Sequence, residues 1–299
     1  CTAHVVEATH DVNVRVVQAC FSDTGKQSSL QVITATSDGS IGSLDVFKQT
    51  YSVVTKSVSH STINAAASDP GNNAIVALAC DDGVVRAFDV TTGTIVYECA
   101  IDDNTSIDER ATSVGFSGMD KQSRTSILAV GYSTGLVRVF EIATGGSGSG
   151  NSTVLATSTL LATITDAHEF GYQVDCVLFA GDEDKLFSAA RDGYLCVSET
   201  GSDLFSWNAK SRVRVSSPNV RAAASVSECK TFVFVAACTG SLNVSAVTGG
   251  GEQSSHVLAF RGDTLALVNG TWRSYRGGIC GMSVAGNPCQ TGKSHETPE

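Results

Sequence analysis

The sequence predicts an all-β fold, a β-propeller of four-stranded antiparallel blades with five clear repeats plus a partial sixth. One segment of 18 residues recurs five times around a turn glycine, and further strand-like segments flank most of its copies. The composition agrees with a globular protein, since the 299 residues are 42% hydrophobic and 17% charged, with 29 glycines and 4 prolines. These values exclude a disordered or collagen-like chain.

The five copies align without a gap and each predicts a tight hairpin. They cover residues 30–47, 74–91, 126–143, 184–201 and 231–248, and their turn glycines are Gly39, Gly83, Gly135, Gly193 and Gly240. An aliphatic residue stands seven positions before each glycine, a small one four before, and an aliphatic one two after. This alternation is typical of strands with a buried face. Glycine suits the turn because it tolerates positive φ.

Additional strands complete most of the predicted units. An upstream strand ends in phenylalanine and a small residue, as at Phe21, Phe116 and Phe179. Downstream, Thr-Gly turns precede another short strand, for example Thr94 to Cys99. Four strands in about 50 residues, repeated along the chain, are the blade of a propeller.

The region after the fifth hairpin predicts an incomplete blade. Residues 257–260 and 265–268 are strand-like, and residues 279–285 resemble a first strand without its second and third. We therefore expect a propeller over residues 1–285 and a polar tail over residues 286–299. The alternatives are a six-bladed ring with a poor closing blade and a piece of a longer array, and we favour the piece.

Several segments resemble WD-repeat units. The clearest such segment begins at Ala167-His168. It continues through the predicted strand Val174 to Phe179 and through the second strand and turn of the hairpin, Lys185 to Gly193. In three copies the pairs Leu44-Asp45, Phe88-Asp89 and Phe140-Glu141 stand where the family usually has Trp-Asp. The resemblance covers roughly residues 3–285. No copy keeps the tryptophan.

The resemblance implies a buried hydrogen-bond network of histidine, serine or threonine, and aspartate in each blade. By position, this network comprises His10, Thr34 and Asp38 in the first repeat and His168, Ser188 and Asp192 in the fourth. The third and fifth repeats have Thr134 and Thr239 in place of the aspartate. Because the pattern recurs with the blades, we interpret these residues as structural and not catalytic, and expect no enzyme, cofactor or metal.

The family resemblance implies a scaffold that binds proteins or peptides through loops and blade edges, usually within a multiprotein complex. The alternatives are a substrate receptor of a cullin-type ubiquitin ligase, a structural component of cilia or centrioles, and a propeller hydrolase. The ten cysteines form no C-x-x-C pair, which favours reduced thiols in an intracellular, cytoplasmic protein, with nuclear or ciliary sites as alternatives. No membrane-spanning segment is expected.

Charge is distributed unevenly along the chain. The formal net charge is −10, which argues against nucleic acid or an anionic membrane as a partner. A basic cluster interrupts the acidic background and predicts a partner-facing surface: Lys210, Arg212, Arg214 and Arg221. The acidic residues of the third inter-blade loop, among them Asp108 and Glu109, are interpreted either as a partner-facing patch or as a solvated insertion.

Overall fold

The computed structural model describes the greater part of the propeller region. The described residues are 16–23, 30–45, 47–55, 61–70, 74–99, 109–117, 125–143, 157–179, 184–201, 206–216, 218–226, 232–239, 254–268 and 272–276. Every regular element in these ranges is a β-strand. None of the described ranges contains an apolar helix of membrane-spanning length.

Within these ranges, twenty strands form five four-stranded antiparallel sheets, each made of consecutive strands. The first sheet contains β1 (Val16–Asp23), β2 (Leu30–Thr36), β3 (Ile41–Asp45) and β4 (Thr50–Thr55). The second contains β5 (Ile63–Ser68), β6 (Ile75–Cys80), β7 (Val85–Asp89) and β8 (Thr94–Cys99). The third contains β9 (Ala111–Phe116), β10 (Thr125–Tyr132), β11 (Val137–Ala143) and β12 (Thr157–Ile164). The fourth contains β13 (Val174–Phe179), β14 (Lys185–Ala190), β15 (Tyr194–Thr200) and β16 (Trp207–Arg214). The fifth contains β17 (Ala222–Val226), β18 (Phe232–Thr239), β19 (Ser254–Arg261) and β20 (Trp272–Arg276).

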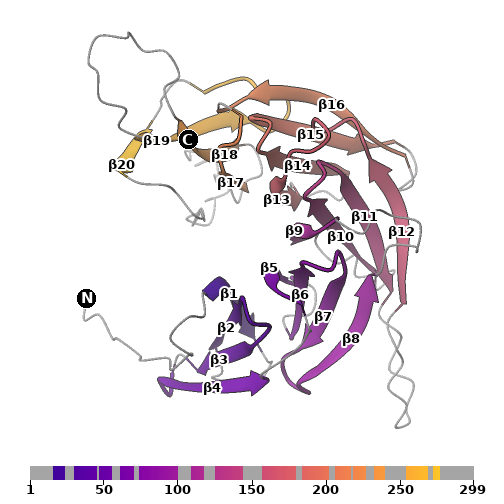
Figure 1. Cartoon of the computed structure of the whole chain (residues 1–299), viewed down its shortest axis with the longest axis vertical. Coiled ribbons are helices and arrows are strands. Elements are labelled where there is room, and N and C mark those ends of the chain that lie inside the picture. Colours follow the sequence, from indigo (N-terminus) through magenta and orange to yellow (C-terminus); the bar gives the residue numbers. More distant parts are fainter. Residues whose placement is uncertain are drawn as a thin grey trace, which may run out of the picture.

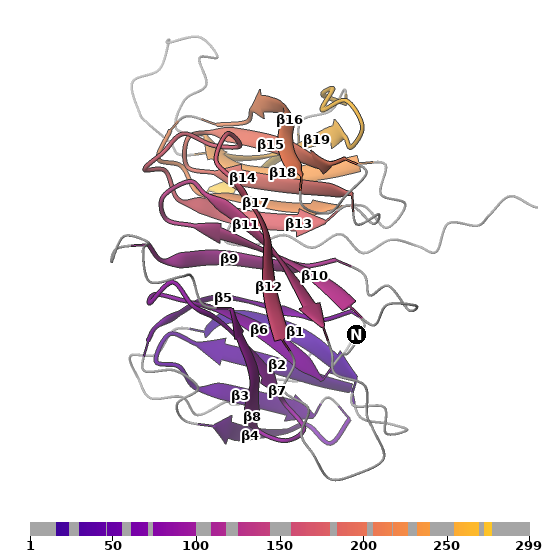
Figure 2. The ribbon, with the colours of Figure 1, turned by 90° about the vertical axis from the view of Figure 1, so that its right-hand side faces the viewer.

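The five sheets are blades of a β-propeller and follow one another along an arc (Figure 1). The first strands of the blades lie on the inside of the arc, where β1 packs against β5, β5 against β9, β9 against β13, and β13 against β17. In Figure 2 the first and second blades lie at one end of the molecule, the third in the middle, and the fourth and fifth at the other end. The predicted four-stranded antiparallel blade is therefore confirmed for five repeats.

The hydrophobic core lies between neighbouring blades. In β6, alternate residues from Ile75 to Ala79 face the third blade, and the intervening residues from Val76 to Cys80 pack on the first. The middle strands are consequently buried along both faces, whereas the outer strands β4 and β16 are largely exposed. Period-two alternation in the second, third and fourth blades separates two buried faces, because each of these blades has a neighbour on both sides.

The predicted turn glycines adopt the conformation that their sequence context requires. Gly39, Gly83, Gly135 and Gly193 have φ values between +81° and +94°. Each follows the second strand of its blade, and its N–H donates to the carbonyl three residues earlier; in the third blade the Gly135 N–H donates to Tyr132. These glycines allow the second strand to reverse into the third.

The fifth hairpin differs from the prediction. Strand β18 pairs with β19 so that Thr239 lies opposite Ser254, and the third strand is residues 254–261 and not the aligned segment 242–248. The predicted pairing of residues 242–248 with the second strand is therefore wrong, whereas Gly240 lies outside the described residues and its tight turn stays a prediction. Residues 257–260, expected beyond the fifth hairpin, belong to its third strand. The first strand of a sixth blade (279–285) and the tail (286–299) also lie outside the described ranges.

Four cysteines whose side chains the structure describes are free thiols in the blades. Cys80, Cys99 and Cys196 are buried and Cys176 is partly buried. Burial raises the pKa of Cys196 to about 11 and that of Cys99 to about 12, so both thiols are protonated and poorly reactive near neutral pH. They act as small apolar core residues.

Gly135 and Gly171 both have positive φ, but only Gly135 has close neighbours, so alanine substitutions at the two positions distinguish backbone strain from steric crowding. A Cβ on Gly135 would lie 2.6 Å from the Glu169 carbonyl oxygen, whereas a Cβ on Gly171, at φ +91°, would meet nothing within 4 Å. Gly171→Ala should lower the free energy of unfolding by about 1 kcal/mol, from φ strain alone. Gly135→Ala should cost clearly more, measured by urea denaturation. Equal losses would contradict the described turn geometry.

Candidate functional site

The predicted network of the fourth blade is assembled in the structure. His168 Nδ1 lies 3.0 Å from Asp192 Oδ2, and His168 Nε2 lies 2.8 Å from Ser188 Oγ. Burial alone would raise the pKa of Asp192, but the hydrogen bond and charge of His168 and the N–H groups of Tyr194 and Glu169 hold it below its usual value. All three side chains are buried, which agrees with a structural role.

In the first blade the corresponding aspartate, Asp38, has different hydrogen-bond partners. Asp38 accepts hydrogen bonds from Thr36 Oγ1 at 2.6 Å and from the N–H and hydroxyl of Ser40 at 3.0 Å. Thr34 instead places its hydroxyl 3.3 Å from the hydroxyl of Tyr51 on β4. His10 lies outside the described residues, so a histidine network in this blade stays a prediction.

The third blade replaces the predicted network with a buried ion pair. Glu109 Oε2 lies 2.7 Å from Arg138 Nη1, and Glu109 Oε1 accepts a hydrogen bond of 2.8 Å from Thr134. The guanidinium of Arg138 also stacks 4.5 Å above the ring of Tyr132. Both interpretations of Glu109, as a partner-facing or solvated acid, are therefore wrong: its carboxylate is buried because it neutralises Arg138. Asp108 lies outside the described residues.

One end of the arc, which we call the turn face, is held by a series of backbone hydrogen bonds. It carries the turns between the second and third strands and the residues just before each first strand: Thr62, Arg110, Gln173 and Arg221. In the second, third and fourth blades, the residue after the second strand donates its N–H to the residue before the first. These bonds are Asp81 to Thr62, Ser133 to Arg110 and Arg191 to Gln173, each 2.9 Å long.

Further backbone bonds continue this series from blade to blade. The N–H of Gly171 donates to the Thr134 carbonyl at 2.8 Å, joining the fourth-blade loop to the third-blade turn. The N–H of Asn219 donates to the Arg191 carbonyl at 2.6 Å, joining the fifth-blade loop to the fourth-blade turn. Asn219 has φ +65°, which asparagine tolerates better than most residues. The turn face is therefore a rigid backbone frame from which side chains project.

A bulge residue near the start of the first strand also links adjacent blades. The pairing register skips Asn64 in β5, Thr112 in β9 and Asp175 in β13. Asn64 donates to the Ala111 carbonyl at 2.9 Å, and Thr112 donates to the Val174 carbonyl at 2.7 Å. Asp175 accepts from the Ala222 N–H at 3.2 Å. Each bulge turns a polar side chain toward the next blade.

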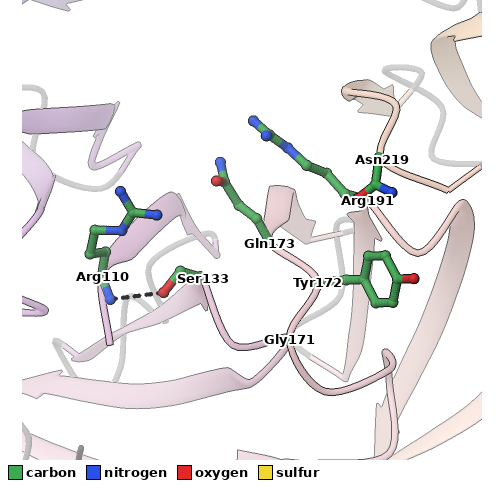
Figure 3. Close-up of a pocket in the computed structure, with 7 residues that line it drawn as sticks. All are labelled: Arg110, Ser133, Gly171, Tyr172, Gln173, Arg191 and Asn219. Carbon is green, nitrogen blue, oxygen red and sulfur yellow. Dashed lines mark hydrogen bonds between the residues drawn. The ribbon is translucent and has the colours of Figure 1, made fainter. Parts of the chain in front are cut away.

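A hollow of about 200 Å³ opens on the turn face between the third and fourth blades. Its lining residues come from the backbone frame: Arg110, Ser133, Gly171, Tyr172, Gln173, Arg191 and Asn219 (Figure 3). In Figure 3 the side chains of Arg110, Gln173 and Arg191 extend toward the same side. Nearby, Phe170 at the loop tip is 82% exposed. Arginine and aromatic side chains in this arrangement suit protein recognition.

Arg191 is oriented by a buried carboxylate. Its Nε lies 3.1 Å from Asp175 Oδ1, and the Asp175 side chain is almost fully buried. Burial raises the pKa of Asp175 above its usual value, although Arg191, the Ala222 N–H and the charge of Arg221 oppose the shift. The Asp175 carboxylate thus holds one edge of the guanidinium, and the opposite edge of Arg191 faces outward.

The predicted basic cluster divides between two places. Lys210, Arg212 and Arg214 are exposed on the outer strand β16, where Arg212 stacks 4.9 Å over the ring of Tyr194. Arg221 instead precedes the inner strand β17 and acts electrostatically on Asp175, which places it on the turn face. The structure therefore does not bring all four cations together.

Sequence reasoning did not identify Arg110 and Arg191 as site residues. Each is a single basic residue beside acidic ones in the sequence, and the two are brought near one hollow only by the packing of the third blade against the fourth. A signal was nevertheless present: both stand at positions fixed by the repeat, immediately before a first strand or after a second. The described residues contain no group of three or more His, Cys, Asp or Glu side chains placed to hold a metal ion.

The fold of this chain is similar to that of several proteins of known structure. Over 91% of its length, this chain matches a chain of the mitotic checkpoint complex with a TM-score of 0.56 and 13% identity, spanning 73% of that chain. It matches a chain of Chaetomium thermophilum Polycomb Repressive Complex 2 with a TM-score of 0.59 and 16% identity. It matches Chaetomium thermophilum Raptor with a TM-score of 0.55 and 17% identity. The likeness is one of fold.

The chain is shorter than these matched proteins. It spans 58% of the matched Polycomb chain and 21% of Raptor. Neither a family model nor a curated protein sequence matches it. The comparisons therefore support the propeller fold, and the resemblance of the repeats to WD-repeat units stays a prediction.

The His168 network should contribute to stability. His168→Ala leaves buried Asp192 and Ser188 without their common partner, and should lower the free energy of unfolding by about 2–3 kcal/mol at pH 7. The pKa of Asp192 is lower in the folded than in the unfolded protein, so ionised Asp192 stabilises the folded state at pH values above its usual pKa. This stabilisation is lost when Asp192 is protonated, and the difference between His168→Ala and wild type should therefore shrink below about pH 4. Glu169→Ala, an exposed neighbour, is the control. Equal melting of both variants and wild type at pH 7 would contradict the assignment.

The ion pair of the third blade gives a second test. Glu109→Gln leaves the buried Arg138 guanidinium without a counter-charge, and should cost roughly 3 kcal/mol of unfolding free energy. The double variant Glu109→Gln/Arg138→Met removes both charges and should recover more than half of the loss. Urea denaturation measures both effects. A double variant no more stable than Glu109→Gln would contradict the assigned pairing.

Proposed function

We propose that this chain is a non-enzymatic protein-interaction scaffold, a WD-repeat-type propeller that binds partner proteins through its turn face. The observation that carries the proposal is the hollow at the junction of the third and fourth blades, lined by Arg110 and Arg191 and flanked by exposed Phe170. Arginine and aromatic side chains are enriched among the residues that contribute most of the binding energy at protein interfaces.

The rigidity of the frame supports the same proposal. The loops that carry Arg110, Tyr172 and Arg191 are fastened by backbone hydrogen bonds within and between blades. Side chains held in advance lose less conformational freedom on binding, which favours affinity. Loops presented by a rigid scaffold are also where recognition residues concentrate.

The outer rim is a poorer candidate surface. Exposed apolar residues there are dispersed on separate blades: Val53 on β4, Ile95 on β8 and Leu160 on β12. The cations of β16 lie on the outermost strand of their sheet, where charged side chains commonly prevent edge-to-edge pairing. We therefore place the main docking surface on the turn face.

Site-specific photocrosslinking tests the surface. The full chain carrying a photoreactive phenylalanine analogue at position 170 should crosslink to partner proteins in cell extract. The same analogue at position 160, exposed on β12, is the matched control and should capture far less. Mass spectrometry identifies the adducts. Identical captured sets at both positions, or capture only from position 160, would contradict the proposed docking surface.

A further inference from the structure

The turn face concentrates positive charge in an acidic protein. The chain has a net charge of −10, yet Arg110 and Arg191 line one hollow, and Arg221 lies close enough to act on the neighbouring Asp175. Asp175 is buried behind Arg191 and offsets one of these charges. The charged residues that line the hollow are thus both arginines, while Arg191 and Arg221 act on the one internal carboxylate, so the lining carries an excess of positive charge.

The guanidinium groups retain hydrogen-bonding capacity for a ligand. Asp175 takes the Nε edge of Arg191, while its two terminal nitrogens have no hydrogen-bond partner within the described ranges. Arg110 is exposed, and among the described residues its side chain likewise has no partner. The planar fork of an arginine matches the two oxygens of a carboxylate.

Polar and aromatic neighbours extend the same surface. Gln173 projects beside Arg191 in Figure 3, and its Nε2 lies 3.0 Å from Asp175 Oδ1. Tyr172 is half-buried in the hollow, and the adjacent Phe170 is exposed. A ligand that follows this surface meets positive charge in the hollow and an aromatic ring beside it.

We propose that this part of the turn face binds an acidic peptide segment, in which Arg110 and Arg191 bind carboxylate side chains and Phe170 covers an adjacent apolar residue. This inference rests on the proposed function and specifies the partner chemistry at that surface. A long polyanion such as nucleic acid fits less well, because residues 1–206 carry a net charge of −14 that repels it. A short segment experiences mainly the local arginines.

Fluorescence anisotropy of the full chain with a labelled peptide, Gly-Ser-Glu-Glu-Leu-Phe-Ser-Gly, tests the proposal. The matched Gln-Gln peptide should bind roughly a hundredfold more weakly, since it loses two charge-assisted hydrogen bonds and each contributes about tenfold. Arg110→Gln and Arg191→Gln should each weaken binding of the Glu-Glu peptide about tenfold. Arg212→Gln, an equal charge change on β16, should leave it within about twofold.

The exposed position of Arg110 and one further variant keep the result interpretable. Arg191→Gln leaves Asp175 buried without its cation, so Arg110→Gln, at an exposed position, provides the test if the former fails to fold. Asp175→Asn removes the competing carboxylate and should tighten binding several-fold. Thermal melting verifies the fold of every variant.

The outcomes separate the acidic-peptide proposal from the proposed function. Equal binding of the Glu-Glu and Gln-Gln peptides, equal losses in Arg212→Gln and Arg110→Gln, or no binding up to about 1 mM overturns the proposal. Binding of a phosphoserine version alone overturns carboxylate recognition in favour of phosphate. Crosslinks from position 170 that survive both arginine substitutions overturn this inference while leaving the docking surface intact. Peptide binding without such crosslinks overturns the docking surface instead.

Discussion

The close approach of the first strands at the inside of the arc determines the rest of the structure. Their backbones come near enough for Asn64 and Thr112 to donate side-chain hydrogen bonds to carbonyls of the next blade. A Cβ on Gly115 of β9 would lie 2.7 Å from the Val177 carbonyl oxygen of β13, so only glycine permits this spacing. Because the second, third and fourth blades each bury both faces against neighbours, the spacing also defines the core between them.

The same constraint makes the turn face a recognition surface. Backbone hydrogen bonds fix the loops, so side chains at repeated positions vary while the frame stays constant. The second blade places Thr62 and Asp81 at positions where the third has Arg110 and Ser133, and the fourth has Gln173 and Arg191. Chemical character on this face is therefore set blade by blade, and positive charge collects where the third and fourth blades meet.

Local features were predictable from the sequence, whereas contacts between distant residues were not. Turn glycines and alternating strands follow from backbone sterics, and four of the five turns have the expected positive φ. The pair of Glu109 and Arg138 joins residues 29 apart that no repeated spacing relates. The fifth hairpin was misassigned because residues 242–248 alternate as convincingly as residues 254–261, and pairing with β18 decides between them.

Hydrogen–deuterium exchange of the full chain, with and without the Glu-Glu peptide, is the most direct test of the turn face as the recognition surface. Exchange should slow at residues 110, 171–173, 191 and 219, which lie in the backbone frame around the hollow. Exchange along β16 should be unchanged. Protection confined to β16, or bound peptide with no protection in the frame, would contradict the account.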